Sequence, residues 1–507
     1  MSQNPLNDAM LPRPLTARWV IRGMLTLETA LHLGSEGTGR VDMPVLRDAR
    51  SNKPLLPGTT LTGALRSALA DRLAGYLNEE PPEVAALFGT RRGEDDGAQS
   101  PLIVFDSVGE LPANGGVEIR DGVAIVAATG IADDHRKYDY EVLPAGTSFP
   151  VRVDLLLPAP AYRDGAPPPT EKSLLEALAA AVDSFADGSF GAKRSRGLGK
   201  VRAVWVAKRF DLSSARGWLD WILSDHVQPF DAIPDRSCIR DVLDAAAPEA
   251  LRPLEFLGDA RNRVVIDLDL RVAHDILIRS SGTEPGDPDV SHLRSGGTAI
   301  LPGTSLAGVM RTHALRIARL VRADKNDAEV WVDRLFGPRF EDPPAAIKPH
   351  ASRVRISESR LEEGHSHVQV RIAIDRFTQG VIPTALFDEQ TDVGGRAIAR
   401  LELRNPHHGE LGLLLLVLKD LLGGFVPVGG TSSVGRGFLS GSATVTWHEG
   451  SASVSRSAMI RPGQQPSGDA AEQIDAAIRA FHQAGSLASP ASGAETTSER
   501  RTRHDHD

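Results

Sequence analysis

The stretch LPGTTLTGALR (residues 56–66) occurs a second time as LPGTSLAGVMR (residues 301–311). In both copies the Pro-Gly pair predicts a tight turn, and the pattern after it predicts the start of a helix. Each copy also has hydroxyl side chains that we expect to accept hydrogen bonds from the free N–H groups of that helix. These residues are Thr59, Thr60, Thr304 and Ser305.

A glycine lies in the first turn of each expected helix, at Gly63 and Gly308. Alanine would suit a helix better by up to about 1 kcal/mol. A glycine repeated at that position suggests close approach by another backbone, or by a phosphate at the positive end of the helix. Arg66 and Arg311 follow three residues later on the same face. Tight packing alone is the simpler explanation, and the other repeats decide between the two.

The composition is that of an ordinary globular protein, with 41% hydrophobic and 24% charged residues. A chain of 507 residues is too long for one core and indicates two or three domains. Aromatic residues, at 5%, argue against base recognition mainly by stacking. A single cysteine, Cys238, excludes an intramolecular disulfide and a cysteine-rich zinc site.

Charge and hydropathy also limit the function. With a net charge of -9, nucleic-acid binding must come from local basic clusters. No stretch has the length and apolarity of a membrane span, and no secretion signal is apparent at the N-terminus. We therefore expect a cytoplasmic location.

The order of motifs in the first half repeats in the second. An alternating strand, a polar loop, the Pro-Gly turn with its helix, an LFG triplet and a glycine-rich loop before a last strand occur twice. We predict two tandem domains of mixed strand and helix, a helical connector and a mostly disordered tail that includes one helix. The expected bounds are residues 15–210, 211–261, 262–448 and 449–507. Residues 122–140 are expected to be a polar, turn-rich segment.

The two glycine-rich loops are GAKRSRGLGK (residues 191–200) and GGTSSVGRGF (residues 429–438). Their backbone N–H groups and cations can face a phosphodiester chain. Neither ends in the Gly-Lys-Ser/Thr of a Walker loop, and neither opens a dinucleotide-binding unit. The second loop keeps the glycines but has only one cation. The candidate contacts are Lys193, Arg194, Arg196, Gly197, Gly199, Gly435, Arg436 and Gly437.

An aspartate precedes each Pro-Gly turn, Asp42 in VDMPVLRD and Asp289 in PDVSHLR, and each is followed by Leu-Arg. A carboxylate beside a phosphate-binding surface could hold a divalent metal or orient a ribose hydroxyl for attack. An isolated loop aspartate is far more often solvated surface. Repetition at the same place favours a function for both, more for Asp42 than for Asp289, whose loop also offers Asp287.

Two histidines offer another chemistry. His32 and His274 lie near the end of the first strand of each domain and could be general bases for metal-free RNA cleavage. A structural role is favoured for both.

Taken together, these motifs resemble the RAMP superfamily of CRISPR-associated proteins. The first half carries LHLGSEGTG, VDMPVLRD, LPGTTLTGALRS, LFG and GAKRSRGLGKV, and the second carries LPGTSLAGVMRT, LFG, IDRFTQG and VGGTSSVGRGF. The series is most similar to the backbone subunits of type III effector complexes. Two copies in one chain resemble the fused double subunit of type III-D systems.

The resemblance implies a ferredoxin-like, RRM-related α+β core in each domain, with hairpin and lid insertions. It implies partners: CRISPR guide RNA, complementary target RNA and the other subunits of the complex. It also implies a divalent metal, Mg²⁺ or Mn²⁺, with which a loop aspartate cleaves the target. That aspartate maps on Asp42, which would hold the metal, and by a looser match on Asp289, since Ser295 stands where the first copy has Asp48.

The guide backbone would be held by the glycine-rich loops and by the two Pro-Gly turns with the helix starts that follow them, residues 56–66 and 301–311 (the organising turns). The remaining expected contacts are Gly58, Thr59, Thr60, Gly63, Arg66, Gly303, Thr304, Ser305, Gly308, Arg311 and Arg376. Two alternatives stay open. The chain could be a scaffold that binds guide RNA without cutting, or a metal-independent endonuclease that processes the guide with His32 as base.

Overall fold

The computed structural model describes most of the chain. The described residues are 14–36, 41–90, 99–113, 115–125, 132–159, 168–224, 238–281, 288–322, 324–338, 350–407, 409–450 and 455–484. Asp287 and the end of the tail, residues 485–507, lie outside them.

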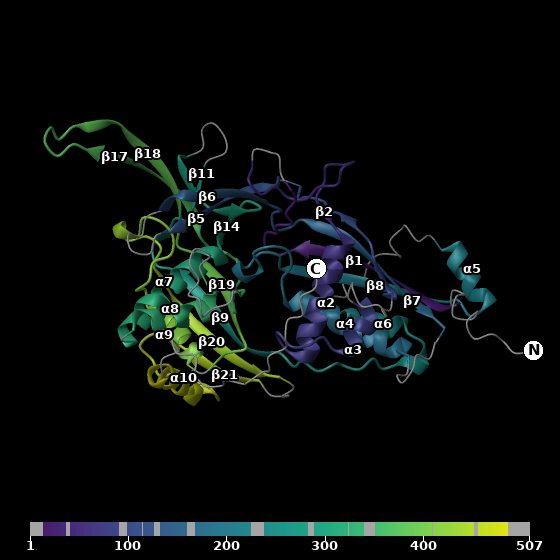
Figure 1. Cartoon of the computed structure of the whole chain (residues 1–507). Helices are drawn as coiled ribbons and strands as arrows, with labels where there is room; N and C mark the ends of the chain where they lie inside the picture. Colours follow the sequence, from purple (N-terminus) through teal and green to yellow (C-terminus); the bar gives the residue numbers. More distant parts are fainter. Residues whose placement is uncertain are drawn as a thin grey trace, which may run out of the picture.

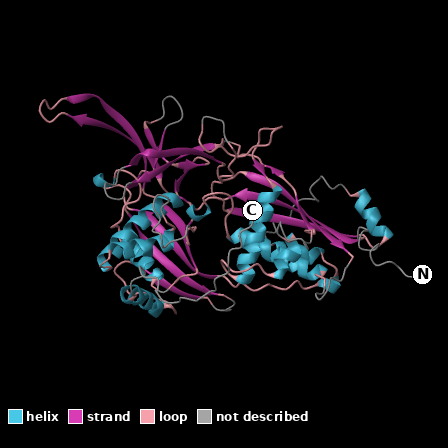
Figure 2. Cartoon of the chain, viewed as in Figure 1, coloured by secondary structure: helices cyan, strands magenta, loops and turns pink. Residues whose placement is uncertain are grey.

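The first domain is built on a four-stranded antiparallel sheet with the order β3-β7-β1-β8. Its central strand β1 alternates buried and half-buried residues, as a strand with one face on a core must. Helices lie on one side of this sheet (Figure 2). The bounds are β1 Leu15–Leu27, β3 Leu102–Val104, β7 Ser148–Pro158, β8 Val201–Asp211, α2 Gly58–Ala74, α3 Pro82–Phe88 and α4 Glu171–Asp187.

The second domain repeats this arrangement and adds one strand, in the order β15-β19-β9-β20-β21. Trp331, Phe336 and Phe481 from its helices are buried in one core with the sheet. The bounds are β9 Asn262–Val272, β15 Val354–Ile356, β19 Arg396–Arg404, β20 Leu439–Glu449, β21 Arg456–Ile460, α7 Gly303–Val321, α8 Lys325–Phe336, α9 Glu410–Leu422 and α10 Ala471–Gln483.

Each domain carries a hairpin outside its main sheet. In the first it is β5 (Glu118–Ile125) with β6 (Ala132–Val142), and in the second β17 (His365–Ile374) with β18 (Val381–Val393). The second hairpin projects from the body of the molecule (Figure 1). The hairpin corrects the expectation of a turn-rich segment at residues 122–140, because much of that segment is the antiparallel pair β5–β6.

Short strands and helical turns complete the description. They are β2 Leu55–Leu56, β4 Ser107–Val108, β10 Asp275–Ile276, β11 Arg279–Ser281, β12 Val290–His292, β13 Arg294–Ser295, β14 Thr298–Leu301, β16 Ser359–Arg360, η1 Arg194–Arg196, η2 Glu249–Leu251 and η3 Ser432–Val434. No helix in the described ranges is both long enough and apolar enough to cross a membrane.

The connector between the domains contains α5 (Ala215–Leu223) and α6 (Ile239–Ala246). Helix α6 buries Ile239, Val242 and Leu243 in the core of the first domain, so it packs as part of that domain.

The one helix expected in the tail is present as α10, but the expectation of disorder is wrong for the residues before it, 455–470. Strand β21 pairs with β20, and α10 packs on α9 with Phe481 fully buried. The apolar residues Ile474, Ala480 and Phe481 lie on one face of α10, whose exposed residues made the tail look polar as a whole.

The two domains are in direct contact. A buried ion pair joins Arg120 of β5 to Glu358 beside β15. The hydroxyl of Tyr76 donates to Oε1 of Glu402 over 2.8 Å. The N–H of Gly296 donates to Glu118 over 2.7 Å. The contacts of Arg120 and Glu118 fix the first hairpin against the second domain, and that of Tyr76 ties the segment after α2 to β19.

Candidate functional site

Asp42 forms a reciprocal pair with Asp139 of β6. The N–H of Asp42 donates to Oδ1 of Asp139 over 2.8 Å, and the N–H of Asp139 donates to Oδ2 of Asp42 over 3.0 Å. The loop runs parallel to the strand here, with Met43 opposite Tyr140. Two carboxylates from segments 97 residues apart in sequence therefore lie side by side near the surface.

The same pair occurs in the second domain. The N–H of Asp289 donates to Oδ1 of Asp388 over 3.3 Å, and the N–H of Asp388 donates to Oδ2 of Asp289 over 3.2 Å. Strand β12 again runs parallel to the hairpin strand, with Val290 opposite Glu389. The loops of Asp42 and Asp289 are thus equivalent down to the oxygens that accept the backbone hydrogen bonds.

The repeated Leu-Arg that follows each aspartate fixes this geometry. Arg47 pairs with Glu141 of β6 at 3.3 Å, and Arg294 pairs with Asp392 of β18 at 2.8 Å. Each arginine ties its loop to the hairpin strand that also carries the second aspartate. Ser295 is buried, and its Oγ accepts from the N–H of Ala145 in the first domain, so its difference from Asp48 belongs to the domain contact.

The donor set fits a divalent cation with few protein ligands. In each pair one oxygen of each carboxylate accepts a backbone hydrogen bond, and the other accepts none from the residues that the structure describes. Within the described residues, neither Asp42 nor Asp139 has an ion-pair partner, and no group of three or more metal-ligating side chains is found. Mg²⁺ is commonly held by one or two carboxylates together with substrate phosphates and water.

The first glycine-rich loop lies on the opposite face of β6. The ammonium group of Lys193 donates to the hydroxyl of Tyr138 over 2.7 Å and lies 4.5 Å from the ring centre of Tyr140. Because side chains alternate along a strand, Tyr138 and Tyr140 face the loop while Asp139 faces Asp42. The sequence predicted both components, and β6 brings them to its two faces.

Arg436 is the candidate that the structure corrects most clearly. Its side chain is 2% exposed and pairs with Glu389 at 2.7 Å and Asp275 at 2.8 Å. A guanidinium enclosed by two carboxylates ties the second loop to its hairpin and does not reach a phosphate in this conformation.

The capping prediction for the organising turns is wrong. Helices α2 and α7 begin after Pro57 and Pro302 without a side-chain cap, and the N–H of Gly58 donates instead to Asp106 over 2.7 Å. The glycines that another backbone approaches closely are Gly58 and Gly303, and not Gly63 and Gly308 as the sequence suggested. A Cβ on Gly58 would lie 2.2 Å from the carbonyl oxygen of Val104, and a Cβ on Gly303 would lie 2.3 Å from that of Ile356.

Apart from their own helices, no atom of the described residues lies within 4 Å of the position of a Cβ on Gly63 or Gly308, so no described backbone segment packs against them. They are exposed, together with Thr59 and Thr304. The arginines that follow are paired inside the chain, Arg66 with Glu80 and Arg311 with Asp333.

The other candidates differ in accessibility. Arg376 is exposed at the tip of the β17–β18 hairpin, and Arg194 and Gly435 are exposed in the two loops. Thr60, Lys193, Arg196 and Ser305 are half-buried. Burial lowers the pKa of Arg196. The glycines inside packed backbone are Gly58, Gly197, Gly199, Gly303 and Gly437.

His32 lies in the core. It is 1% exposed, its Nδ1 is 2.7 Å from the carbonyl oxygen of Glu141, and its ring meets Tyr140 edge to face. These contacts are those of a structural histidine, as expected. His274 is not the equivalent of His32 in the second domain. The carbonyl of His32 accepts from Ala192 in the first glycine-rich loop, and the carbonyl that accepts from Gly430 in the second loop belongs to Leu277.

Sequence reasoning missed Asp139 and Asp388. The available signal was the alternation K-Y-D-Y-E at residues 137–141, in which polar and aromatic residues take turns with a period of two. A strand there would have placed Asp139 on one face with Glu141.

Comparison with known proteins agrees with this duplicated arrangement. The family model described as RAMP superfamily matches residues 24–202 and 269–440. The chain is 36% identical over 80 residues to the CRISPR system Cms endoribonuclease Csm3 of Enterococcus italicus, covering 14% of this chain and 37% of that protein. It is 38% identical over 84 residues to the protein of the same name from Mycobacterium tuberculosis, covering 14% and 36%.

The chain therefore spans about a third of the length of the curated relatives it matches. The family model, in contrast, covers more than half of the chain and falls on both domains, each with its own turn, glycine-rich loop and aspartate pair. The chain belongs to the RAMP superfamily.

Proposed function

We propose that this chain is a guide-RNA-binding backbone subunit of a type III CRISPR effector complex, and that it cleaves complementary target RNA with Asp42 and Asp289. One observation carries the catalytic part: the same reciprocal aspartate pair occurs at the same place in both domains. A second support for RNA cleavage is that the relatives of this chain are named endoribonucleases.

The chemistry follows from the free carboxylate oxygens. Asp42 and Asp139 would hold Mg²⁺ or Mn²⁺ between them, and the metal would stabilise the charge that develops on the phosphate being attacked. The backbone bonds fix both side chains before substrate arrives, which lowers the cost of ordering them. The free oxygen of Asp42 would accept the proton of a 2′-hydroxyl as the 2′-oxygen attacks the adjoining phosphorus. The P–O5′ bond would break, and the departing 5′-oxygen would take a proton from water.

The guide would lie along the exposed parts of the two organising turns and the loop that carries Lys193. The surface candidates Thr59, Gly63, Thr304 and Gly308 offer hydroxyls and close backbone approach without base preference. We also assign each core to the ferredoxin-like fold, because the strand orders β3-β7-β1-β8 and β15-β19-β9-β20 place strands and helices in the βαββαβ sequence.

The test uses guide-loaded complex and end-labelled target RNA, with Mg²⁺ or Mn²⁺ and with EDTA. Asp42→Asn should lower cutting at one target position by at least about 100-fold, and Asp289→Asn should do so at a second position. Asp139→Asn and Asp388→Asn should each affect the same position as their partner, because each removes one of two ligands. Guide and target binding, measured by gel shift, should not change.

The matched control is Asp121→Asn, on the same hairpin but paired with Lys137 at 3.3 Å and not with Asp42. It should leave the products unchanged. An unaltered product ladder from the Asp42→Asn complex would refute the catalytic assignment and favour the scaffold. Cutting that survives EDTA would refute the role of the metal.

A further inference from the structure

A cavity lies between the two domains, bounded by α2 and α4 on one side and by β15 and β19 on the other. Its inner part offers about 40 Å³ to the centres of water-sized spheres. That is room for roughly three water molecules or one tetrahedral oxyanion. Arg194, Arg355 and Glu402 line both this inner part and a neighbouring chamber of about 630 Å³.

The inner part is lined by five arginines but three carboxylates. Most of these charges are already matched. Arg404 donates to Glu402 over 2.6 Å and lies 3.7 Å from Asp71. Arg261 pairs with Asp259 behind the cavity wall and with Asp187 at the wall, and Arg263 also pairs with Asp259. With Asp259 included, four carboxylates match five arginines, so one positive charge is left over.

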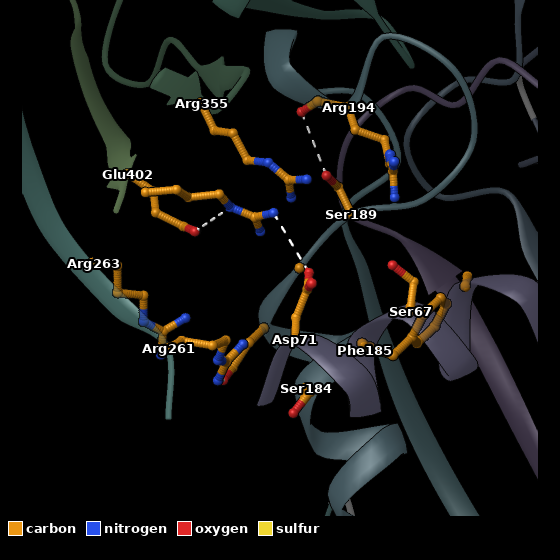
Figure 3. Close-up of a pocket in the computed structure, with 15 residues that line it drawn as sticks. Ser67, Asp71, Ser184, Phe185, Ser189, Arg194, Arg261, Arg263, Arg355 and Glu402 are labelled. Atoms are coloured by element: carbon orange, nitrogen blue, oxygen red, sulfur yellow. Dashed lines mark hydrogen bonds and ion pairs between the residues drawn. The ribbon is translucent and has the colours of Figure 1, made fainter. Parts of the chain in front are cut away.

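The excess is carried by Arg194 and Arg355. In the part of the chain that the structure describes, the guanidinium group of neither has an ion pair or a hydrogen bond. Both line the cavity, Arg194 from the first domain and Arg355 from the second (Figure 3). Burial, and then the neighbouring charge of Arg404, lower the pKa of Arg355 to about 10. Two unmatched guanidinium groups facing one space favour an anion between them.

We propose that this cavity binds the phosphate group of a small molecule, held between Arg194 and Arg355, with the hydroxyl of Ser67 at its wall. The planar guanidinium fork matches the oxygens of a phosphate, and the two domains each supply one fork. The ligand is inorganic phosphate or a phosphate monoester whose remainder occupies the larger chamber. A space that takes one oxyanion does not admit two successive phosphates of an RNA strand.

The experiment is calorimetric titration of the full-length, RNA-free chain at constant ionic strength, with inorganic phosphate, with AMP and with a single-stranded RNA. Phosphate should bind and raise the melting temperature, since it bridges the two domains. Arg194→Met and Arg355→Met should each weaken phosphate binding at least tenfold, and Arg355→Lys should weaken it less. Tighter binding of AMP than of phosphate would identify a monoester, and equal binding would identify the free ion.

Arg202→Met is the control, because Arg202 lines the larger chamber and not the inner part. It should bind phosphate as the wild type does. Arg355 is one of the charges that keep the buried Glu402 ionised, so Arg355→Met should melt somewhat below the wild type when phosphate is absent. The rise in melting temperature on adding phosphate, taken from each protein's own phosphate-free value, should be lost in Arg355→Met. A rise as large as that of the wild type would overturn the proposal. The proposal would also be overturned if the wild type did not bind phosphate, or if Arg355→Met bound phosphate as tightly as the wild type. It would likewise be overturned if Arg355→Met weakened the binding of RNA and not that of phosphate.

Discussion

Single side chains explain how a repeated sequence gives two equivalent aspartate pairs. Arg47 and Arg294 pair with carboxylates on the hairpin strands, and the backbone bonds between aspartates follow from the register that these arginines set. Where the two repeats have different residues, a contact with a neighbouring residue accounts for the change. Thr431 occupies the position of Lys193, and its hydroxyl accepts a hydrogen bond of 3.3 Å from the buried guanidinium group of Arg436.

Glu402 gives a prediction at the residue scale. Burial would raise the pKa of its carboxyl, but Arg404, Arg355 and Arg263 lower it to about 2, from 4.5. A carboxyl with a depressed pKa in the folded state stabilises the fold above its unfolded pKa and loses that effect as the pH falls. We expect Glu402→Gln to lower the free energy of unfolding at neutral pH by on the order of 2 kcal/mol.

The measurement is urea unfolding at several pH values. The difference between wild type and Glu402→Gln should shrink as the pH falls from 4.5 towards 2. Glu79→Gln, which removes an exposed carboxyl, should show no such pH dependence. A constant difference across this range would contradict the assignment.

At the scale of elements, the two glycine-rich loops have one conformation and two surroundings. Gly197 and Gly435 end equivalent turns with φ of 88° and 91°. A Cβ on Gly197 would lie 2.1 Å from the backbone nitrogen of Glu358 in the second domain, whereas nothing lies within 4 Å of that position on Gly435. The first loop is therefore packed by the next domain, and the second is open.

This difference predicts unequal effects of the same substitution. Gly435→Ala should cost about 1–2 kcal/mol, because alanine is strained in the left-handed region. Gly197→Ala should cost clearly more, because it also forces the two domains apart. Thermal unfolding of both variants checks this, and equal costs would mean that the backbone conformation alone requires glycine at these positions.

The sequence predicted the elements that local patterns determine. The Pro-Gly turns gave the starts of α2 and α7, and the glycine-rich loops were correctly placed before β8 and β20. The resemblance implied hairpin insertions, but the residue pattern did not locate the β5–β6 hairpin. Its strands pair mainly with each other, and residues such as Gly122 interrupt the alternation expected over a core. The Asp42–Asp139 pair was missed because it depends on contact between distant segments, which periodicity cannot reveal.

At the scale of the whole molecule, the domains are tied by more than their connector. The buried Arg120–Glu358 pair and the Tyr76–Glu402 bond cross the boundary. Helix α6, which begins the second half of the connector, is buried in the first domain. The two halves each have a core, but they are not independent.

We therefore expect the halves to stay together after cleavage of the chain. A protease site placed within residues 225–237, between α5 and α6, should be cut to give two fragments that elute as one species of unchanged mass in size-exclusion chromatography. Arg120→Met should weaken this association, since it leaves Glu358 buried without its partner. Elution of two separate wild-type fragments would show that the connector alone holds the domains together.

The covalent link between the domains has a consequence for genetics. Separate subunits that share a fold can occupy neighbouring places in any order and any number. Here each translated molecule supplies one copy of each domain, always in the same sequence, at an effective concentration far above that of free proteins. If the chain assembles and cuts as proposed above, a single codon change at Asp42 or at Asp289 therefore alters one of two alternating places and leaves its neighbour intact.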